Sequence, residues 1–110
     1  MSDNTTTIAD LRALMRAFVA ERQWEKFHSP KNLVMSIAIE AAELMEHFQW
    51  VEVAESRAVK EQPAKLADIG EEVADVLAYV LALANALELD LSETLRKKML
   101  KNAVKYPPVA

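Results

Sequence analysis

The sequence predicts an all-α protein, and composition and patterning both support this. The chain has 110 residues and a single glycine, Gly70, whereas β-sandwiches and α/β folds need many glycines in their turns. Apolar residues make up 52% of the chain, enough for the core of one domain. They recur at helical spacing between capping and proline sequences. We therefore expect one helical domain over residues 1–110, with flexible tails at residues 1–7 and 107–110.

The first two of four expected helices have clear starting sequences. Thr7 and Asp10 have the spacing of a capping box, so the first helix should run from about residue 8 to residue 26. Ser29 and Pro30 supply an N-cap and a first-turn proline for a second helix that ends near Val51. Residues 52–62 are polar and form a connector or a short helix.

The last two helices also begin and end at recognisable residues. Pro63 suits the first turn of a third helix, which should end near Leu87. Asp90 and Glu93 have capping-box spacing and open a fourth helix to about Val104. A Tyr-Pro-Pro sequence follows it, and proline cannot continue a helix.

The second and third expected helices are apolar around most of their circumference. At about 100° per residue, apolar side chains cover roughly 240° of the second helix. An ordinary surface helix shows the reverse, with an apolar stripe on a polar cylinder. We therefore expect an oligomer in which a second copy of the chain covers part of these helices. The narrow polar sectors hold Ser36, Glu40, Glu43 and His47 on the second helix, and Asp68, Glu72, Asp75 and Tyr79 on the third.

Four carboxylates in these polar sectors form a candidate metal site. Glu40 and Glu43 stand one turn apart, as do Glu72 and Asp75, so each pair can share an ion. Carboxylates on largely buried helices are costly unless a cation compensates them. Oxygen ligands favour Mg²⁺, or Mn²⁺ as a substitute, and magnesium commonly completes its shell with substrate phosphates. The pattern therefore indicates phosphate chemistry.

Other site chemistries fit the sequence less well. A di-iron bundle needs Glu-x-x-His, but Leu44 precedes His47 by three residues, and the Glu25–His28 pair lies outside both acidic stripes. One glycine is too few for a P-loop or a Rossmann turn, and the absence of cysteine excludes a thiolate nucleophile. A net charge of −4 argues against an extended nucleic-acid interface. A polar N-terminus and the lack of a long apolar stretch predict a cytoplasmic protein that does not enter a membrane.

Four segments of the chain resemble the MazG-like family of all-α nucleotide pyrophosphohydrolases, and within it the dCTP pyrophosphatase-like branch. The family pattern of Glu-x-x-Glu followed by Glu-x-x-Asp is met by Glu40, Glu43, Glu72 and Asp75. The resemblance covers roughly residues 8 to 108. The matching segments are ERQWEKFHSPKNL, ELMEHFQW, EEVADVLAYVLALA and KMLKNAVKYP.

The resemblance implies a four-helix bundle that hydrolyses a nucleoside triphosphate between the α and β phosphates. It further implies Mg²⁺ dependence, a homo-oligomer built as a dimer of dimers, and dCTP or a modified dCTP as the preferred substrate. The four carboxylates would be both metal ligands and catalytic residues, with Glu43 a candidate to orient the attacking water. Substrate-binding positions carried over from the branch are Trp24, Trp50, Tyr79, Lys98 and Asn102, and less specifically His28, Lys31 and Tyr106.

One position departs from the branch, and several functions stay open. Met15 stands where a polar residue, often histidine, is expected on the first helix, which bears on contacts to the base and so on cytosine preference. A related helical enzyme could act on dUTP or a phosphoribosyl-nucleotide. The competing class is a non-enzymatic helical interaction module whose acidic groove binds a basic partner.

Overall fold

The computed structural model describes residues 1–109 and is helical, with no strand among those residues. The all-α prediction is therefore confirmed. Within residues 1–109 no helix combines the length and apolar character needed to cross a bilayer. The expected tail at residues 107–110 ends on Ala110, which lies outside the described residues. The elements are α1 (Ile8–Glu21), a 3₁₀ turn η1 (Glu25–Phe27), α2 (Pro30–Glu46), α3 (Val53–Ala58), a second 3₁₀ turn η2 (Val59–Glu61), α4 (Pro63–Leu87) and α5 (Leu91–Lys105).

The helices begin where the capping sequences place them. Thr7 and Asp10 form the complete capping box of α1, with Asp10 N donating to Thr7 Oγ1 at 3.1 Å and Thr7 N donating to Asp10 Oδ2 at 2.9 Å. The Ser29 hydroxyl caps α2 by accepting from the backbone of its third residue. Asp90 caps α5 by accepting from Glu93 N at 2.8 Å.

Two helices end earlier than expected. The first ends at Glu21 rather than near residue 26, because Gln23 adopts a left-handed conformation with a φ of 54° that an α-helix cannot include. The second ends at Glu46 rather than near Val51, and turns occupy residues 47–51. The polar segment 52–62 contains a short helix, one of the two forms expected for it.

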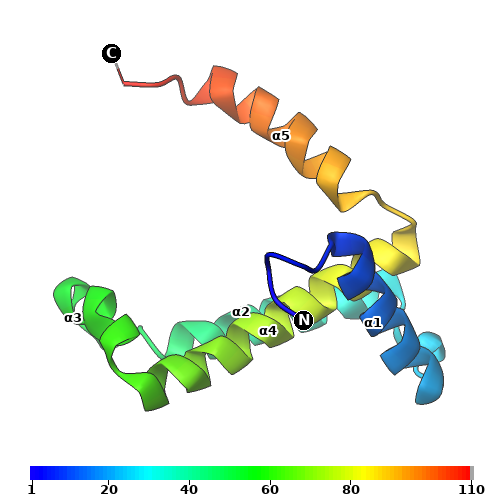
Figure 1. Ribbon diagram of the computed structural model, residues 1–110, viewed down its shortest axis with the longest axis horizontal. Helices are drawn as coiled ribbons and strands as arrows, with labels where there is room; N and C mark the ends of the chain where they lie inside the picture. The colour runs from blue at the N-terminus through cyan, green and yellow to red at the C-terminus, as the bar shows by residue number, and fades with distance from the viewer. Residues whose placement is uncertain (110) are drawn as a thin grey trace.

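The core lies between α2 and α4, which run antiparallel along most of their lengths, while α1 crosses the C-terminal half of α4 (Figure 1). Leu33 of α2 is the most deeply buried large side chain. The antiparallel arrangement turns the polar sector of α2 toward that of α4. The other buried apolar side chains are Val19, Val59, Ile69, Leu81, Ala82 and Ala84.

Helix α5 extends away from the rest of the chain and packs closely on none of the other helices (Figure 1). The accessible surface is 8660 Å², whereas a compact monomer of 12.3 kDa exposes about 6,100 Å². The radius of gyration is 16.6 Å, against about 13 Å for a compact chain of this length. One chain therefore leaves about 2,500 Å² more surface uncovered than a folded monomer does.

Candidate metal centre and adjoining pocket

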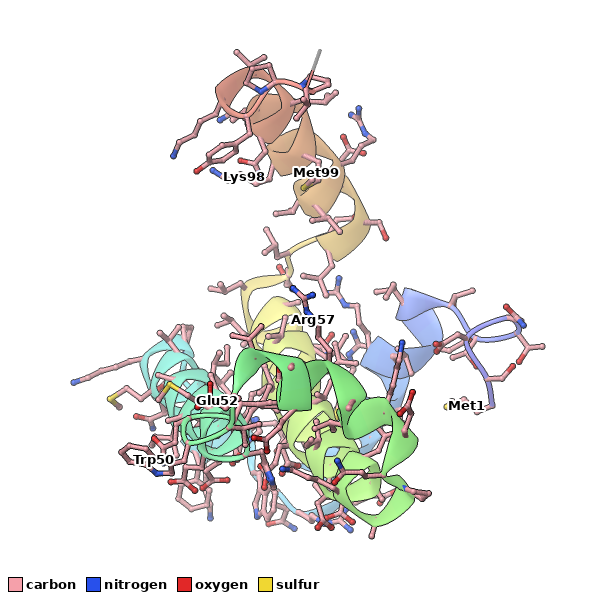
Figure 2. The ribbon with its side chains drawn as sticks, turned by 90° about the vertical axis from the view of Figure 1, so that its left-hand side faces the viewer. Met1, Trp50, Glu52, Arg57, Lys98 and Met99 are labelled. Carbon is pink, nitrogen blue, oxygen red and sulfur yellow. The ribbon has the colours of Figure 1, made fainter. Side chains whose placement is uncertain are left out.

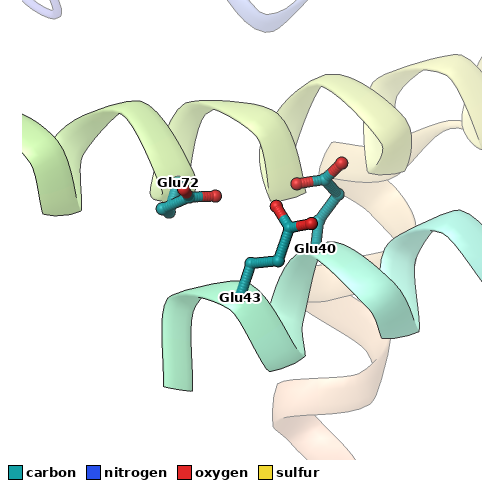
Figure 3. Close-up of side chains that lie close together, drawn as sticks. All are labelled: Glu40, Glu43 and Glu72. Carbon is teal, nitrogen blue, oxygen red and sulfur yellow. The ribbon is translucent and has the colours of Figure 1, made fainter. Parts of the chain in front are cut away.

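Three glutamates from two helices meet between α2 and α4. Glu40 and Glu43 of α2 face Glu72 of α4 across the gap between the helices (Figure 3). One carboxylate oxygen from each lies within 4.8 Å of the other two. The spacing of three residues on α2 puts both of its glutamates on the side toward α4, and antiparallel packing brings Glu72 opposite them.

Among residues 1–109, these carboxylates lack hydrogen-bond and ion-pair partners that would compensate their burial and charge. Glu40 Oε2 and Glu72 Oε2 are both shielded from solvent, and neither has a hydrogen-bond partner. Burial raises the pKa of Glu40 above its usual range, and so do the neighbouring Glu43 carboxyl group and the charges of Asp75 and Glu72. Neither ion pair among residues 1–109 involves the cluster. No ion pair among those residues therefore balances its negative charge.

The pKa of Glu72 is raised for the same reasons. Burial is the largest cause, followed by the charges of Glu43 and Asp75, and His47 partly offsets them. A bound cation would offset the cost of removing these carboxylates from water and the repulsion between them, because each oxygen without a partner would gain a bond to the metal. The donors are all carboxylate oxygens, which suit a hard divalent ion such as Mg²⁺, Mn²⁺ or Ca²⁺. The residues present therefore fit a metal ion.

Asp75 stands slightly apart from the three glutamates. Its side chain is exposed, one turn after Glu72 on α4, and it lies outside the group whose oxygens meet within 4.8 Å. Its charge nevertheless raises the pKa of Glu40 and of Glu72. Asp75 also lines a neighbouring pocket, so it occupies the boundary between the acidic cluster and that pocket.

The pocket next to Asp75 has a volume of about 380 Å³ and mainly apolar walls. It lies where α1 crosses α4, and two alanines on α4 leave the space for it. Its lining residues are Met15, Phe18, Trp24, Ala74, Asp75, Ala78 and Tyr79.

Four rings form an aromatic arc along the pocket and beyond it. Phe18 meets Trp24 edge-on, with ring centroids 5.7 Å apart and an interplanar angle of 73°. His28 lies between Trp24 and Tyr79, at centroid distances of 6.3 and 6.4 Å. Phe18 was not foreseen as a site residue, because its position depends on how α1 crosses α4. Its one sequence signal is its place one turn after Met15 on α1.

The remaining predicted site residues do not reach the cluster within one chain. Trp50 follows α2 and is 90% exposed. Lys98 lies on α5, away from the helices that carry the acidic cluster (Figure 2). Asn102 is also on α5 and Tyr106 directly follows it. Lys31, in the first turn of α2, is exposed. Their predicted roles are untested by the single chain.

Two mammalian proteins similar to this chain are named dCTP pyrophosphatase 1. The chain is 43% identical to dCTP pyrophosphatase 1 of Rattus norvegicus and 41% identical to that of Homo sapiens, each over 101 residues. These alignments cover 92% of this chain and 59% of each relative, so the chain spans about three fifths of their length.

A solved structure and a family profile agree with these relatives. The crystal structure of a pyrophosphatase from Archaeoglobus fulgidus matches with a TM-score of 0.81 and 37% identity, covering 98% of this chain and 99% of that one. The MazG-like profile matches residues 35–109, which include all four predicted metal-binding carboxylates and α5. The chain belongs to the MazG-like family.

Proposed function

We propose that this protein is a Mg²⁺-dependent nucleoside triphosphate pyrophosphohydrolase, which cleaves between the α and β phosphates and releases a nucleoside monophosphate and pyrophosphate. The observation that carries this proposal is the adjacency of an uncompensated carboxylate cluster and an aromatic pocket, joined at Asp75. A metal-bound triphosphate suits the first and a nucleobase suits the second. The names of the similar proteins support dCTP, or a modified dCTP, as the substrate.

In this proposal each carboxylate has a part in holding the phosphates. Glu40 and Glu72 bind the cation through their shielded oxygens, and Glu43 completes the set. A divalent ion held there would neutralise charge on the phosphates and make a bound water more acidic. Glu43 is exposed on its α2 face, so it is our candidate to orient the attacking water. Asp75 binds the cation from the side of the aromatic pocket, where the nucleotide lies in this proposal.

The aromatic pocket receives the base. Stacking on an aromatic face is favourable for any nucleobase, and Trp24 offers such a face beside Phe18. Tyr79 lines the pocket, and we assign its hydroxyl to the sugar or to the base edge. His28 lies outside the lining and packs near the Tyr79 ring, with the centroids 6.4 Å apart. Met15 presents a thioether where a hydrogen-bonding residue would read the base, which keeps dUTP and related nucleotides as alternative substrates.

Further copies of the chain complete the site in this proposal. A triphosphate is highly anionic, and no lysine or arginine forms an ion pair with the acidic cluster among residues 1–109. Lys98 and Asn102 lie on α5 beside Leu95 and Met99, which are exposed apolar side chains. Docking of this face on another subunit would cover apolar surface and deliver a lysine to the phosphates. We propose a four-helix bundle completed in this way, within a dimer of dimers. In that assembly Trp50 and Tyr106 would also contact the substrate.

We further propose that residues 1–110 act as one domain in the cytoplasm, on a small-molecule nucleotide and without a nucleic-acid or membrane partner. The net charge of −4 supports the absence of a nucleic-acid partner, because long polyanions would be repelled.

The experiment is a turnover screen over common and modified triphosphates, with Mg²⁺ present and the products identified. Monophosphate and pyrophosphate are expected, with dCTP or its modified forms fastest and no turnover after chelation. Glu40→Gln and Asp75→Asn should abolish turnover while circular dichroism shows an intact fold. Glu46→Gln, an exposed neighbour on α2 outside the cluster, is the matched control. Release of a nucleoside diphosphate and inorganic phosphate, or full activity in Glu40→Gln, would contradict the proposal. A wild-type protein that neither binds Mg²⁺ nor hydrolyses any triphosphate would favour a helical interaction module.

A further inference from the structure

A set of hydrogen bonds, called the polar tie below, joins the second turn of α1 to the last turn of α4. Arg12 Nε donates to Asn85 Oδ1 at 3.0 Å, and Asn85 Nδ2 donates back to the Arg12 carbonyl at 3.0 Å. Arg12 also donates to the carbonyls of Ala84 and Leu89, and Arg16 donates to Asn85 Oδ1 at 3.0 Å. Within residues 1–109, side-chain hydrogen bonds between distant parts of the chain occur only here.

The tie matters because α1 has little apolar packing to hold it. Val19 is the one buried side chain of α1, and Leu14 and Phe18 remain exposed. Apolar contacts are non-directional, and a helix held by few of them can slide or rotate. Hydrogen bonds from a guanidinium are charge-assisted and directional. The Arg12–Asn85 tie therefore sets the register of α1 along α4.

That register controls the dimensions of the aromatic pocket. Met15 and Phe18 form its α1 wall and lie about one and two turns after Arg12. Ala78 and Tyr79 form part of its α4 wall and lie about two turns before Asn85. A shift of α1 along α4 moves one wall against the other.

We infer that Arg12 and Asn85 are positioning residues for the nucleotide: their tie holds α1 where its side chains form a pocket of the right width for the base. The inference rests on the proposed function, since it assigns the pocket to the base. Neither residue lines the pocket, so both act through the placement of α1. The acidic cluster lies between α2 and α4, so metal binding is independent of the tie.

Asn85→Ala removes both hydrogen bonds between Arg12 and Asn85 and the bond from Arg16, and it leaves the bonds from Arg12 to the Ala84 and Leu89 carbonyls. Asn85→Asp is the conservative variant. The aspartate keeps oxygens that accept from Arg12 and Arg16 and loses only the donor to the Arg12 carbonyl. For Asn85→Ala we expect KM to rise about tenfold with kcat within about twofold, because substrate binding and not the chemical step is affected. Asn85→Asp should restore KM to within about threefold of wild type. Mn²⁺ affinity should be unchanged in both, and Arg57→Gln, an exposed arginine on α3, should leave every value unchanged.

A readout without turnover separates this inference from the proposed function. In a Trp50→Phe background, Trp24 reports on the pocket, and Asn85→Ala should increase its quenching by acrylamide and speed hydrogen exchange in α1. Asn85→Asp should reverse both effects. These changes support the positioning role even if no triphosphate is hydrolysed, which would defeat the proposed function alone. An unchanged KM with unchanged Trp24 quenching in a folded Asn85→Ala protein, or a failure of Asn85→Asp to rescue either, would overturn the inference.

Discussion

Replacing Leu95 by aspartate should weaken the assembly of this protein, because Leu95 lies on the α5 face that we propose docks on another subunit. Leu95 is 63% exposed in the single chain, on a helix that packs closely on no other helix within residues 1–109. Lys98 and Asn102 follow it on the same face, about one and two turns later. Loss of docking should therefore remove the proposed substrate contacts of Lys98 and Asn102 together with the subunit contact.

The loss of assembly free energy expected for Leu95→Asp follows from the exposed fraction of Leu95. Full burial of a leucine contributes about 1.5–3 kcal/mol, so covering the 63% of Leu95 that is exposed contributes about 1–2 kcal/mol. A two-fold interface contains the residue twice, which gives about 2–4 kcal/mol of assembly free energy. At about 1.4 kcal/mol per factor of ten, the dissociation constant should rise by roughly 30- to 1,000-fold, before the cost of burying a charge is added.

Sedimentation velocity over a dilution series measures this change. The wild type should sediment as an oligomer, while Leu95→Asp should dissociate at higher protein concentration and lose turnover in parallel. Lys101→Asp introduces the same side chain on another side of α5 and should leave the mass unchanged. A wild-type mass of 12.3 kDa, or an unchanged mass for Leu95→Asp, would refute the docking of α5.

Two further predictions concern stability. Gly70→Ala should raise the free energy of unfolding by about 1 kcal/mol, because alanine is preferred to glycine in a helix and the added Cβ meets nothing within 4 Å. Urea denaturation measures this change. A loss of stability would mean that another surface packs against Gly70. Without metal, stability should fall as pH rises from below the ordinary carboxyl pKa through the raised pKa values of Glu40 and Glu72, because the folded state holds protons that the unfolded state has released. Denaturation at several pH values tests this, and Glu40→Gln should flatten the dependence; an equally steep profile in that variant would count against the cluster as its cause.

Helix starts and the acidic cluster were accessible from sequence because local chemistry encodes them. The Thr7 and Ser29 caps act on their own first turns, so short patterns were sufficient to place α1 and α2. The meeting of Glu40, Glu43 and Glu72 followed from two helical periodicities and one antiparallel packing. These features can therefore be predicted with little information about the rest of the chain.

Features that depend on distant residues were not accessible in this way. The left-handed conformation of Gln23, which ends α1 early, occurs at a residue with no glycine-like preference. Phe18 enters the pocket wall because α1 crosses α4 at a particular place. The partners Arg12 and Asn85 lie 73 positions apart, and neither has a local signal for the other. The direction of α5 leaves its apolar face uncovered, and nothing in its own sequence specifies what covers it.

Mn²⁺ binding measured by electron paramagnetic resonance tests the carboxylate site most directly, because free and bound ions have different signals. The wild type should bind Mn²⁺ in competition with Mg²⁺, and Glu72→Gln should weaken binding by about tenfold or more, since it removes one charged ligand. Glu71→Gln removes the same charge from the adjacent, exposed position outside the cluster and should bind as the wild type does. Equal affinity for the wild type and Glu72→Gln, or equal weakening by Glu71→Gln, would contradict a metal centre at Glu40, Glu43 and Glu72.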